Sequence, residues 1–158
     1  MARRFLAILR ILVGLLLLNL AFKKWRDPDF FQLAGFAKEV ARHGAPFPFY
    51  AEFLTGFIFP HARLFAILSA LGETAVGLSL LLGAFTNPMS ILGMLMVANF
   101  ALATTYDRPG TAIGNLVFVL LIGLFGVRSI GATWGLDALL ARVLPPRLVF
   151  FPYPREPR

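Results

Sequence analysis

Four apolar stretches divide this chain, and each approaches the roughly 20 residues that an α-helix needs to cross about 30 Å of hydrocarbon. Hydrophobic residues make up 58% of the 158-residue sequence and charged residues only 15%, and the charges fall between the apolar stretches. This pattern is too apolar for a soluble domain and is typical of an integral membrane protein. We expect membrane crossings at about residues 5–22, 62–84, 89–106 and 112–127.

The connections between the last three stretches are short. AFTNP (84–88) joins the second to the third, and DRPGT (107–111) joins the third to the fourth. Connections of this length join antiparallel neighbours. We therefore predict an all-α fold, an integral membrane four-helix up-down bundle that forms a single membrane domain over residues 1–158.

The net charge of +7 is dispersed along the chain and builds no basic face, so we expect no nucleic acid partner and assign the charge to membrane anchoring. The sequence has no cysteine, which excludes disulfides, thiol catalysis and iron–sulfur ligation within it. A signal peptide is the alternative interpretation of the first stretch. Polar and bulky residues follow it where a small-residue cleavage site would be expected, so we expect a retained helix.

Basic residues close both ends of the first stretch. Arg3, Arg4 and Arg10 precede or begin it, and Arg10 can snorkel to the nearer interface, which favours a cytoplasmic N-terminus. An even number of crossings then places the C-terminus on the same side. The other end carries an interfacial anchor and candidate partner contact formed by Lys23, Lys24, Trp25 and Arg26.

The remaining segments are too interrupted to cross the membrane. In the loop 27–61 we predict interfacial helices: a short amphipathic one near Phe30 that Gly44 ends, then a phenylalanine-rich part up to Pro60, where the second crossing begins. In residues 128–158 we predict a short C-terminal surface helix, followed by a proline-rich tail that needs a partner or lipid to be ordered. Trp134 in this segment is a further candidate for interfacial or partner contact.

Glu73 lies near the middle of the second stretch. A helical wheel places it on a stripe of small residues with leucines opposite, so its side chain should face the bundle interior. Counting about 1.5 Å per residue puts it about 15 Å deep, level with Asn99 on the third helix. Either the two line a site for a quinone head group or a proton path, or a protonated Glu73 bonds Asn99 or a carbonyl to fix helix register.

Three further polar residues extend this pattern. Asn19 and Asn115 lie nearer the outer surface on the first and fourth helices, at depths that let them face each other, and Tyr106 shares the stripe of Asn99. They are candidate ligand-binding residues in a polar line towards Glu73. The simpler interpretation is hydrogen bonding between helices.

The sequence carries no catalytic or metal-binding motif. His43 and His61 are its only histidines, and both fall outside the predicted crossings, which excludes a bis-histidine haem inside the bundle. Either could ligate a haem or pigment at the interface, although a solvated loop histidine is the simpler interpretation. We predict no catalytic residue, no metal site and no covalently bound cofactor.

Several stretches together resemble the DoxX/DoxD family of four-helix bacterial and archaeal membrane proteins. They are RILVGLLLLNLAFKKW, HGAPFPFYAEF, LGETAVGLSLLLGAFTNPMSILGMLMVANF and GVRSIGATWGLDALLARVL. The resemblance rests most on Glu73 with Gly77, Gly83 and Thr86, and WGLDALL supports the DoxD side, which resembles the small membrane subunit of a thiosulfate:quinone oxidoreductase. It implies a bacterial or archaeal cytoplasmic membrane, a redox function and quinone as a candidate cofactor.

Three functions follow as hypotheses. The first is a membrane subunit of a quinone-linked oxidoreductase or other electron-transfer assembly, which binds quinone, lipid and partner subunits without carrying redox centres itself. The second is a purely structural or assembly subunit of a larger membrane complex. The third, a small transporter or proton path, is less favoured because a single acid makes a thin pathway and the chain shows no clear inverted repeat.

Overall fold

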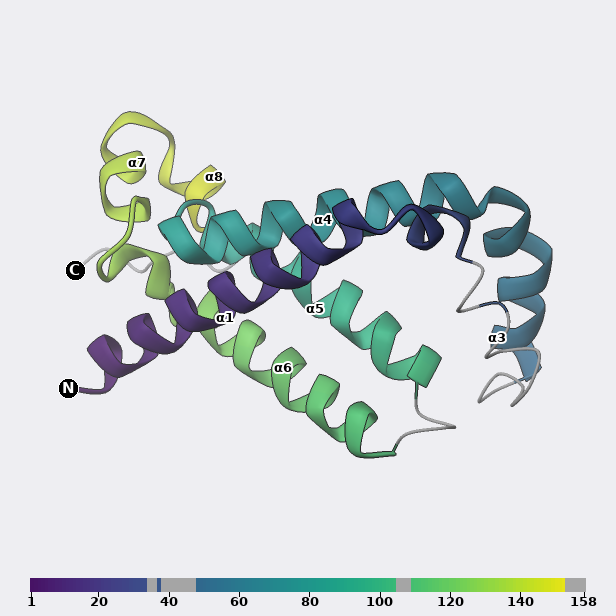
Figure 1. The fold of residues 1–158 in the computed structure, drawn as a ribbon. Coiled ribbons are helices and arrows are strands. Elements are labelled where there is room, and N and C mark those ends of the chain that lie inside the picture. The colour runs from purple at the N-terminus through teal and green to yellow at the C-terminus, as the bar shows by residue number, and fades with distance from the viewer. Residues whose placement is uncertain (34–36, 38–47, 105–108, 153–158) are drawn as a thin grey trace.

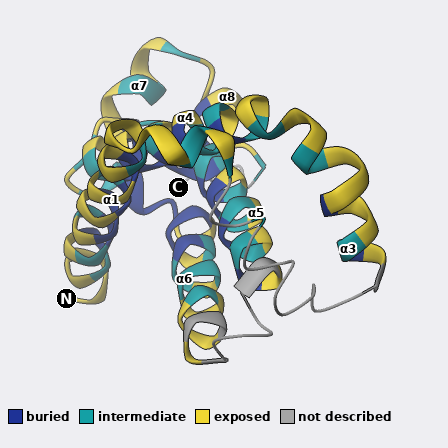
Figure 2. Ribbon diagram, turned by 45° about the vertical axis from the view of Figure 1, so that its right-hand side comes forward, coloured by how far each residue is buried: buried dark blue, intermediate teal, exposed yellow. Residues whose placement is uncertain are grey.

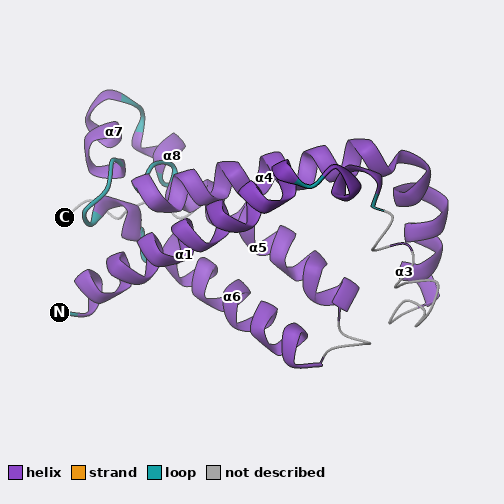
Figure 3. Cartoon of the chain, viewed as in Figure 1, coloured by secondary structure: helices purple, strands orange, loops and turns teal. Residues whose placement is uncertain are grey.

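The chain folds into helices that run from one end of the molecule to the other (Figures 1 and 3). This computed structural model describes residues 1–33, 37, 48–104 and 109–152, and those residues contain no strand, which confirms the all-α prediction for them. The longer helices are α1 (Ala2–Arg26), α4 (Ala62–Leu82), α5 (Thr86–Thr104) and α6 (Pro109–Val127). The shorter ones are η1 (Pro28–Gln32), α3 (Pro48–Phe53), η2 (Leu54–Ile58), η3 (Phe59–His61), η4 (Ile130–Ala132), α7 (Asp137–Val143) and α8 (Pro146–Val149).

Each of the four predicted crossings coincides with one of the long helices. Two helical stretches, Ala2–Arg26 and Phe49–Leu82, are long and apolar enough to cross a membrane. Within α5 and α6 the apolar helical parts are shorter, Thr86–Leu102 and Ile113–Val127. At about 1.5 Å per residue each of those two helices is nevertheless close to the thickness of the hydrocarbon core.

The long helices pack as two antiparallel pairs, α1 with α4 and α5 with α6. The buried faces of these helices turn towards one another and the exposed faces turn outwards (Figure 2). Glycines allow α1 and α4 to approach closely, since a Cβ on Gly14 would lie 2.6 Å from the backbone nitrogen of Leu81. Small residues at such contacts are typical of helices that pack in a membrane.

The helix that contains the second crossing starts earlier than predicted. Pro60 lacks a backbone N–H and was expected to mark the start of that crossing. The backbone instead remains helical from Phe49 to Leu82, passing through the π-helical turn η2 and the 3-10 turn η3. Figure 1 shows this segment bending away from the start of α4, so that α3 turns back towards the end of α5. The predicted amphipathic helix and its end at Gly44 lie mostly outside the described residues.

The segment after α6 folds back onto the rest of the chain. We predicted a surface helix and a tail that needs a partner, but Val149 and Phe150 are buried against this chain itself. The amide of Asn87 at the start of α5 donates to the carbonyl oxygen of Phe150 and to the hydroxyl of Ser129. Residues up to at least Phe150 are therefore held by the connection between α4 and α5.

Candidate functional site

A cavity of about 830 Å³ opens where the end of α1, η1, α3, η2, α4 and α5 meet. Most of its lining is apolar, and its polar side chains come from four different elements. Leu68, Leu71 and Leu95 line it and are also exposed on the outer surface. The polar residues that line it are Lys24, Tyr50, Ser69 and Asn99.

Lys24 is the only charged residue among those that line this cavity in the described structure. Its Nζ lies 2.6 Å from Oε1 of Glu73 and 3.4 Å from Oγ of Ser69. The same Nζ lies 4.6 Å from the ring centroid of Phe100 and 5.1 Å from that of Phe30. The ammonium is thus held by one carboxylate and contacts two aromatic rings.

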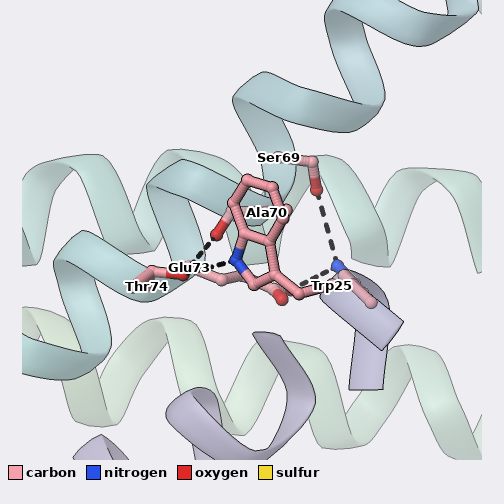
Figure 4. A network of polar contacts seen from close by, with 6 residues as sticks. Trp25, Ser69, Ala70, Glu73 and Thr74 are labelled. Carbon is pink, nitrogen blue, oxygen red and sulfur yellow. Dashed lines mark hydrogen bonds and ion pairs between the residues drawn. The ribbon is translucent and has the colours of Figure 1, made fainter. Parts of the chain in front are cut away.

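Glu73 faces the interior, as its position among small residues predicts. Its side chain is 5% exposed, and its second oxygen, Oε2, is buried with no hydrogen-bond partner in the described part of the chain. Trp25 follows Lys24 on α1, and Thr74 follows Glu73 on α4. The Trp25 indole donates to Oγ1 of Thr74 at 3.1 Å, which adds a second link between the two helices (Figure 4). The Thr74 hydroxyl in turn donates to the carbonyl oxygen of Ala70.

The partner of Asn99 is Tyr50, not Glu73. The Tyr50 hydroxyl donates to Oδ1 of Asn99 at 3.0 Å, which fastens α3 to α5. A bond between Glu73 and Asn99 was one of the interpretations left open, but each of the two is bonded to a different residue of the cavity lining. Lys24 on α1 and Asn99 on α5 thus place polar groups from two different helices in the same cavity.

The contacts of Glu73 also revise its predicted depth. Because Lys24 lies near the end of α1 and pairs with Glu73, the last turn of α1 is level with the middle of α4. Glu73 is therefore level with the end of α1, which lies just beyond the first predicted crossing. The first turns of α4 extend beyond α1 and are covered there by η1.

The other predicted site residues that the structure describes do not line this cavity. Asn19 is exposed on α1, and Asn115 is half-buried on α6. Lys23 and Arg26 are exposed at the end of α1, as an anchor would be, and Arg26 stacks on the ring of Phe22. Tyr106 lies outside the described residues.

A second polar cluster, at the opposite end of the molecule, was not predicted. Arg10, expected to snorkel, is fully buried and donates from Nη2 to the carbonyl oxygen of Trp134 at 3.1 Å, while the Trp134 side chain is exposed. Asp137 is also fully buried, and its two oxygens accept the backbone N–H groups of Phe85 at 2.6 Å and Thr86 at 3.1 Å. A carboxylate from a distant segment thus caps the start of α5.

The charges of this second cluster balance each other. Burial raises the pKa of the Asp137 carboxyl, while the backbone N–H bonds from Thr86 and Phe85 and the charge of Arg10 act in the opposite direction. Both carboxyl oxygens accept hydrogen bonds, which favours the ionised form. The sequence contains a single indication of this cluster, which is that Asp137 lies inside the apolar run GLDALL. That pattern is equally consistent with a buried acid and with an exposed one.

The described residues hold no group of three or more potential metal ligands. His61 is exposed, and its Nδ1 lies 3.0 Å from the carbonyl oxygen of Phe57. His43 lies outside the described part of the chain.

Comparison with known proteins gives a match to a protein family. The family model described as DoxX matches residues 5–106, more than half of the chain, and this region contains most of α1, all of α4 and α5, and every residue that lines the cavity. No curated protein and no solved structure matches the sequence.

Proposed function

The chain belongs to the DoxX family of membrane proteins, and from this premise we propose that it is the membrane subunit of a quinone-linked oxidoreductase or other electron-transfer assembly. In that assembly it binds the quinone and the partner subunits. The partner subunits carry the redox centres, and this chain carries none itself. The observation that carries this proposal is the apolar cavity with Lys24 and Asn99 on its wall.

The polar groups of the cavity suit a ligand that offers hydrogen-bond acceptors. Of the three donors of the Lys24 ammonium, one remains beyond those directed at Glu73 and Ser69. Oδ1 of Asn99 already accepts from Tyr50, which leaves the amide N–H groups of Asn99 as donors. The two carbonyl oxygens of a quinone head group match donors placed on two elements, Lys24 on α1 and Asn99 on α5.

The apolar part of the cavity suits the isoprenoid tail. Leu68, Leu71 and Leu95 belong both to the cavity wall and to the exposed surface of α4 and α5, which lipid covers in a membrane protein. A lipophilic ligand can therefore enter sideways from the bilayer without crossing water. Ligand sites of this kind combine a largely apolar lining with a few placed polar groups.

The proposal includes a multi-pass arrangement. α1, α4, α5 and α6 each cross the cytoplasmic membrane of a bacterium or archaeon, with both termini on the cytoplasmic side. The cavity then lies at the far side, where α1 ends in Lys23, Lys24, Trp25 and Arg26. Cysteine-labelling of positions 2 and 152 in sealed vesicles tests this orientation.

The binding test uses the full chain in detergent with a short-tailed ubiquinone or menaquinone analogue. We expect saturable quenching of the Trp25 fluorescence in a Trp134→Phe background. Lys24→Gln should weaken the affinity about tenfold, because a charge-assisted hydrogen bond is worth roughly 1.5–3 kcal/mol. The matched control is Arg26→Gln, which removes a charge two residues away that does not line the cavity. Equal affinities for the two variants, or no saturable binding by the wild type, would refute the proposal.

A structural or assembly role is the second candidate, and the Lys24–Glu73 ion pair favours it because the pair ties α1 to α4. Glu73→Gln separates the two functions. A neutral isostere should leave assembly and electron transfer intact if Glu73 only fixes the helices, but should impair electron transfer if the residue belongs to a quinone site. The measurements are co-purification of partner subunits and quinone reduction by the assembled complex.

A further inference from the structure

A second cavity, here called the Arg63 groove, lies between the end of α1 with η1 and the start of α4. Its volume is about 840 Å³, and it shares no lining residue with the cavity that contains Lys24 and Asn99. Neighbouring residues point to opposite sides: Lys24 lines one cavity and Trp25 the other, and the same holds for Phe30 and Phe31. The groove is lined by Trp25, Pro28, Phe31, Gln32, Arg63 and Leu64, together with Phe59, Pro60, His61, Ala62 and Ile67.

The polar side chains of the Arg63 groove offer a positive charge and hydrogen-bond donors. Arg63 is exposed and forms no ion pair within the described residues. Gln32 is exposed beside it and offers the amide donors. His61 donates from Nδ1 to the carbonyl oxygen of Phe57, which leaves Nε2 of the neutral ring as an acceptor for a hydroxyl. None of the described lining residues is acidic. Asp27 and Asp29 flank the lining residue Pro28, but neither belongs to the lining.

The remaining walls are apolar and aromatic. The indole N–H of Trp25 is committed to Thr74, so the ring itself is what faces the groove, and Phe31 packs on it with ring centroids 5.6 Å apart. Leu64 and Ile67 extend the apolar wall along α4. Tryptophan and basic residues at the end of a membrane helix mark the level of the lipid head groups.

We propose that the Arg63 groove binds an anionic phospholipid, with the phosphate of the head group on the Arg63 guanidinium and the first carbons of an acyl chain along Leu64 and Ile67. The charge of the groove selects an anion, and its apolar wall selects one attached to a hydrocarbon chain. Arginine presents several donors in a planar fork that matches phosphate oxygens. Gln32 and His61 then contact the glycerol or head-group hydroxyls.

The test is retention of lipid by the full chain in native mass spectrometry, after reconstitution with equal amounts of phosphatidylglycerol and phosphatidylcholine. We expect the wild type to retain phosphatidylglycerol roughly fivefold over phosphatidylcholine, the preference that one basic residue near a lipid surface provides. Arg63→Gln should reduce this preference to less than twofold, and Arg63→Lys should keep part of it.

Two controls make the result decisive. Arg147→Gln removes an exposed charge from α8 at the other end of the molecule, and it should leave the preference unchanged. Thermal unfolding in pure phosphatidylcholine should be the same for Arg63→Gln and the wild type, because Arg63 is exposed. Equal retention of the two lipids by the wild type overturns the proposal, as does an equal loss in the Arg63 and Arg147 variants. Displacement of the lipid by millimolar inorganic phosphate would identify a site for free anions instead.

Discussion

Asp137→Asn tests whether the carboxylate that caps α5 stabilises the end of the molecule where α4 connects to α5. The substitution keeps the size of the side chain but removes its charge. An NH2 group replaces one of the two carboxylate oxygens. This group cannot accept a hydrogen bond, so the backbone N–H of either Phe85 or Thr86 loses its acceptor. Arg10, which is fully buried, loses the charge that compensates it.

The size of the effect follows from these two losses. Within the described residues Arg10 and Asp137 form no direct ion pair, so the loss of the Asp137 charge costs less than the roughly 3–5 kcal/mol that removing one partner of a buried ion pair costs. A buried N–H that loses its acceptor costs about 1–3 kcal/mol. Since the two effects share the same site they will not add fully, and we expect a total loss of about 2–4 kcal/mol in the free energy of unfolding.

The assay is unfolding of the purified chain in mixed micelles, followed by circular dichroism as the fraction of denaturing detergent rises. Glu52→Gln is the control, since Glu52 is exposed, and its effect should stay within about 0.5 kcal/mol. The double variant Arg10→Met with Asp137→Asn should recover at least about 1 kcal/mol of the loss. A loss below about 1 kcal/mol for Asp137→Asn, or no recovery in the double variant, would refute the reasoning.

Two further predictions concern the helix contacts. Gly14→Ala should lower the free energy of unfolding by about 1–3 kcal/mol, because its Cβ would lie 2.6 Å from the backbone nitrogen of Leu81. Gly114→Ala, with nothing within 4 Å, should leave that free energy unchanged or raise it by up to about 1 kcal/mol, so equal losses in the two variants would contradict the close packing of α1 on α4. Tyr50→Phe removes the hydrogen bond to Asn99, worth about 0.5–1.5 kcal/mol, and should speed amide hydrogen exchange in α3 severalfold; exchange at the wild-type rate would show that this bond does not hold α3.

The helices were predictable because hydrophobic length alone defines them. The stretch 62–84 agrees with α4 to within two residues at its end, and 112–127 ends at the same residue as α6. The inward orientation of Glu73 was also predictable, since the wheel depends only on helical geometry. These are properties that neighbouring residues along the chain determine.

The partners of the polar residues were not predictable in the same way. The depth of Glu73 was counted from Ala62, but the end of α1 lies level with the middle of α4, so that Lys24 reaches the carboxylate and Asn99 does not. Asn99 bonds Tyr50 because the helix continues through Pro60 and bends. The relative shift of two packed helices depends on side-chain fit, which a sequence pattern does not encode.

The cap that Asp137 provides also imposes an order on the making of this protein. The backbone N–H of Phe85 is bonded by a residue that lies 52 positions later in the chain. During synthesis, α4 and α5 are therefore made while the start of α5 is uncapped and Arg10 is still without its counter-charge. The cap can form only after α6 and the segment beyond it have been made. Until then the helix pairs are free to adjust against each other, and the last part to be made fixes the arrangement of the first.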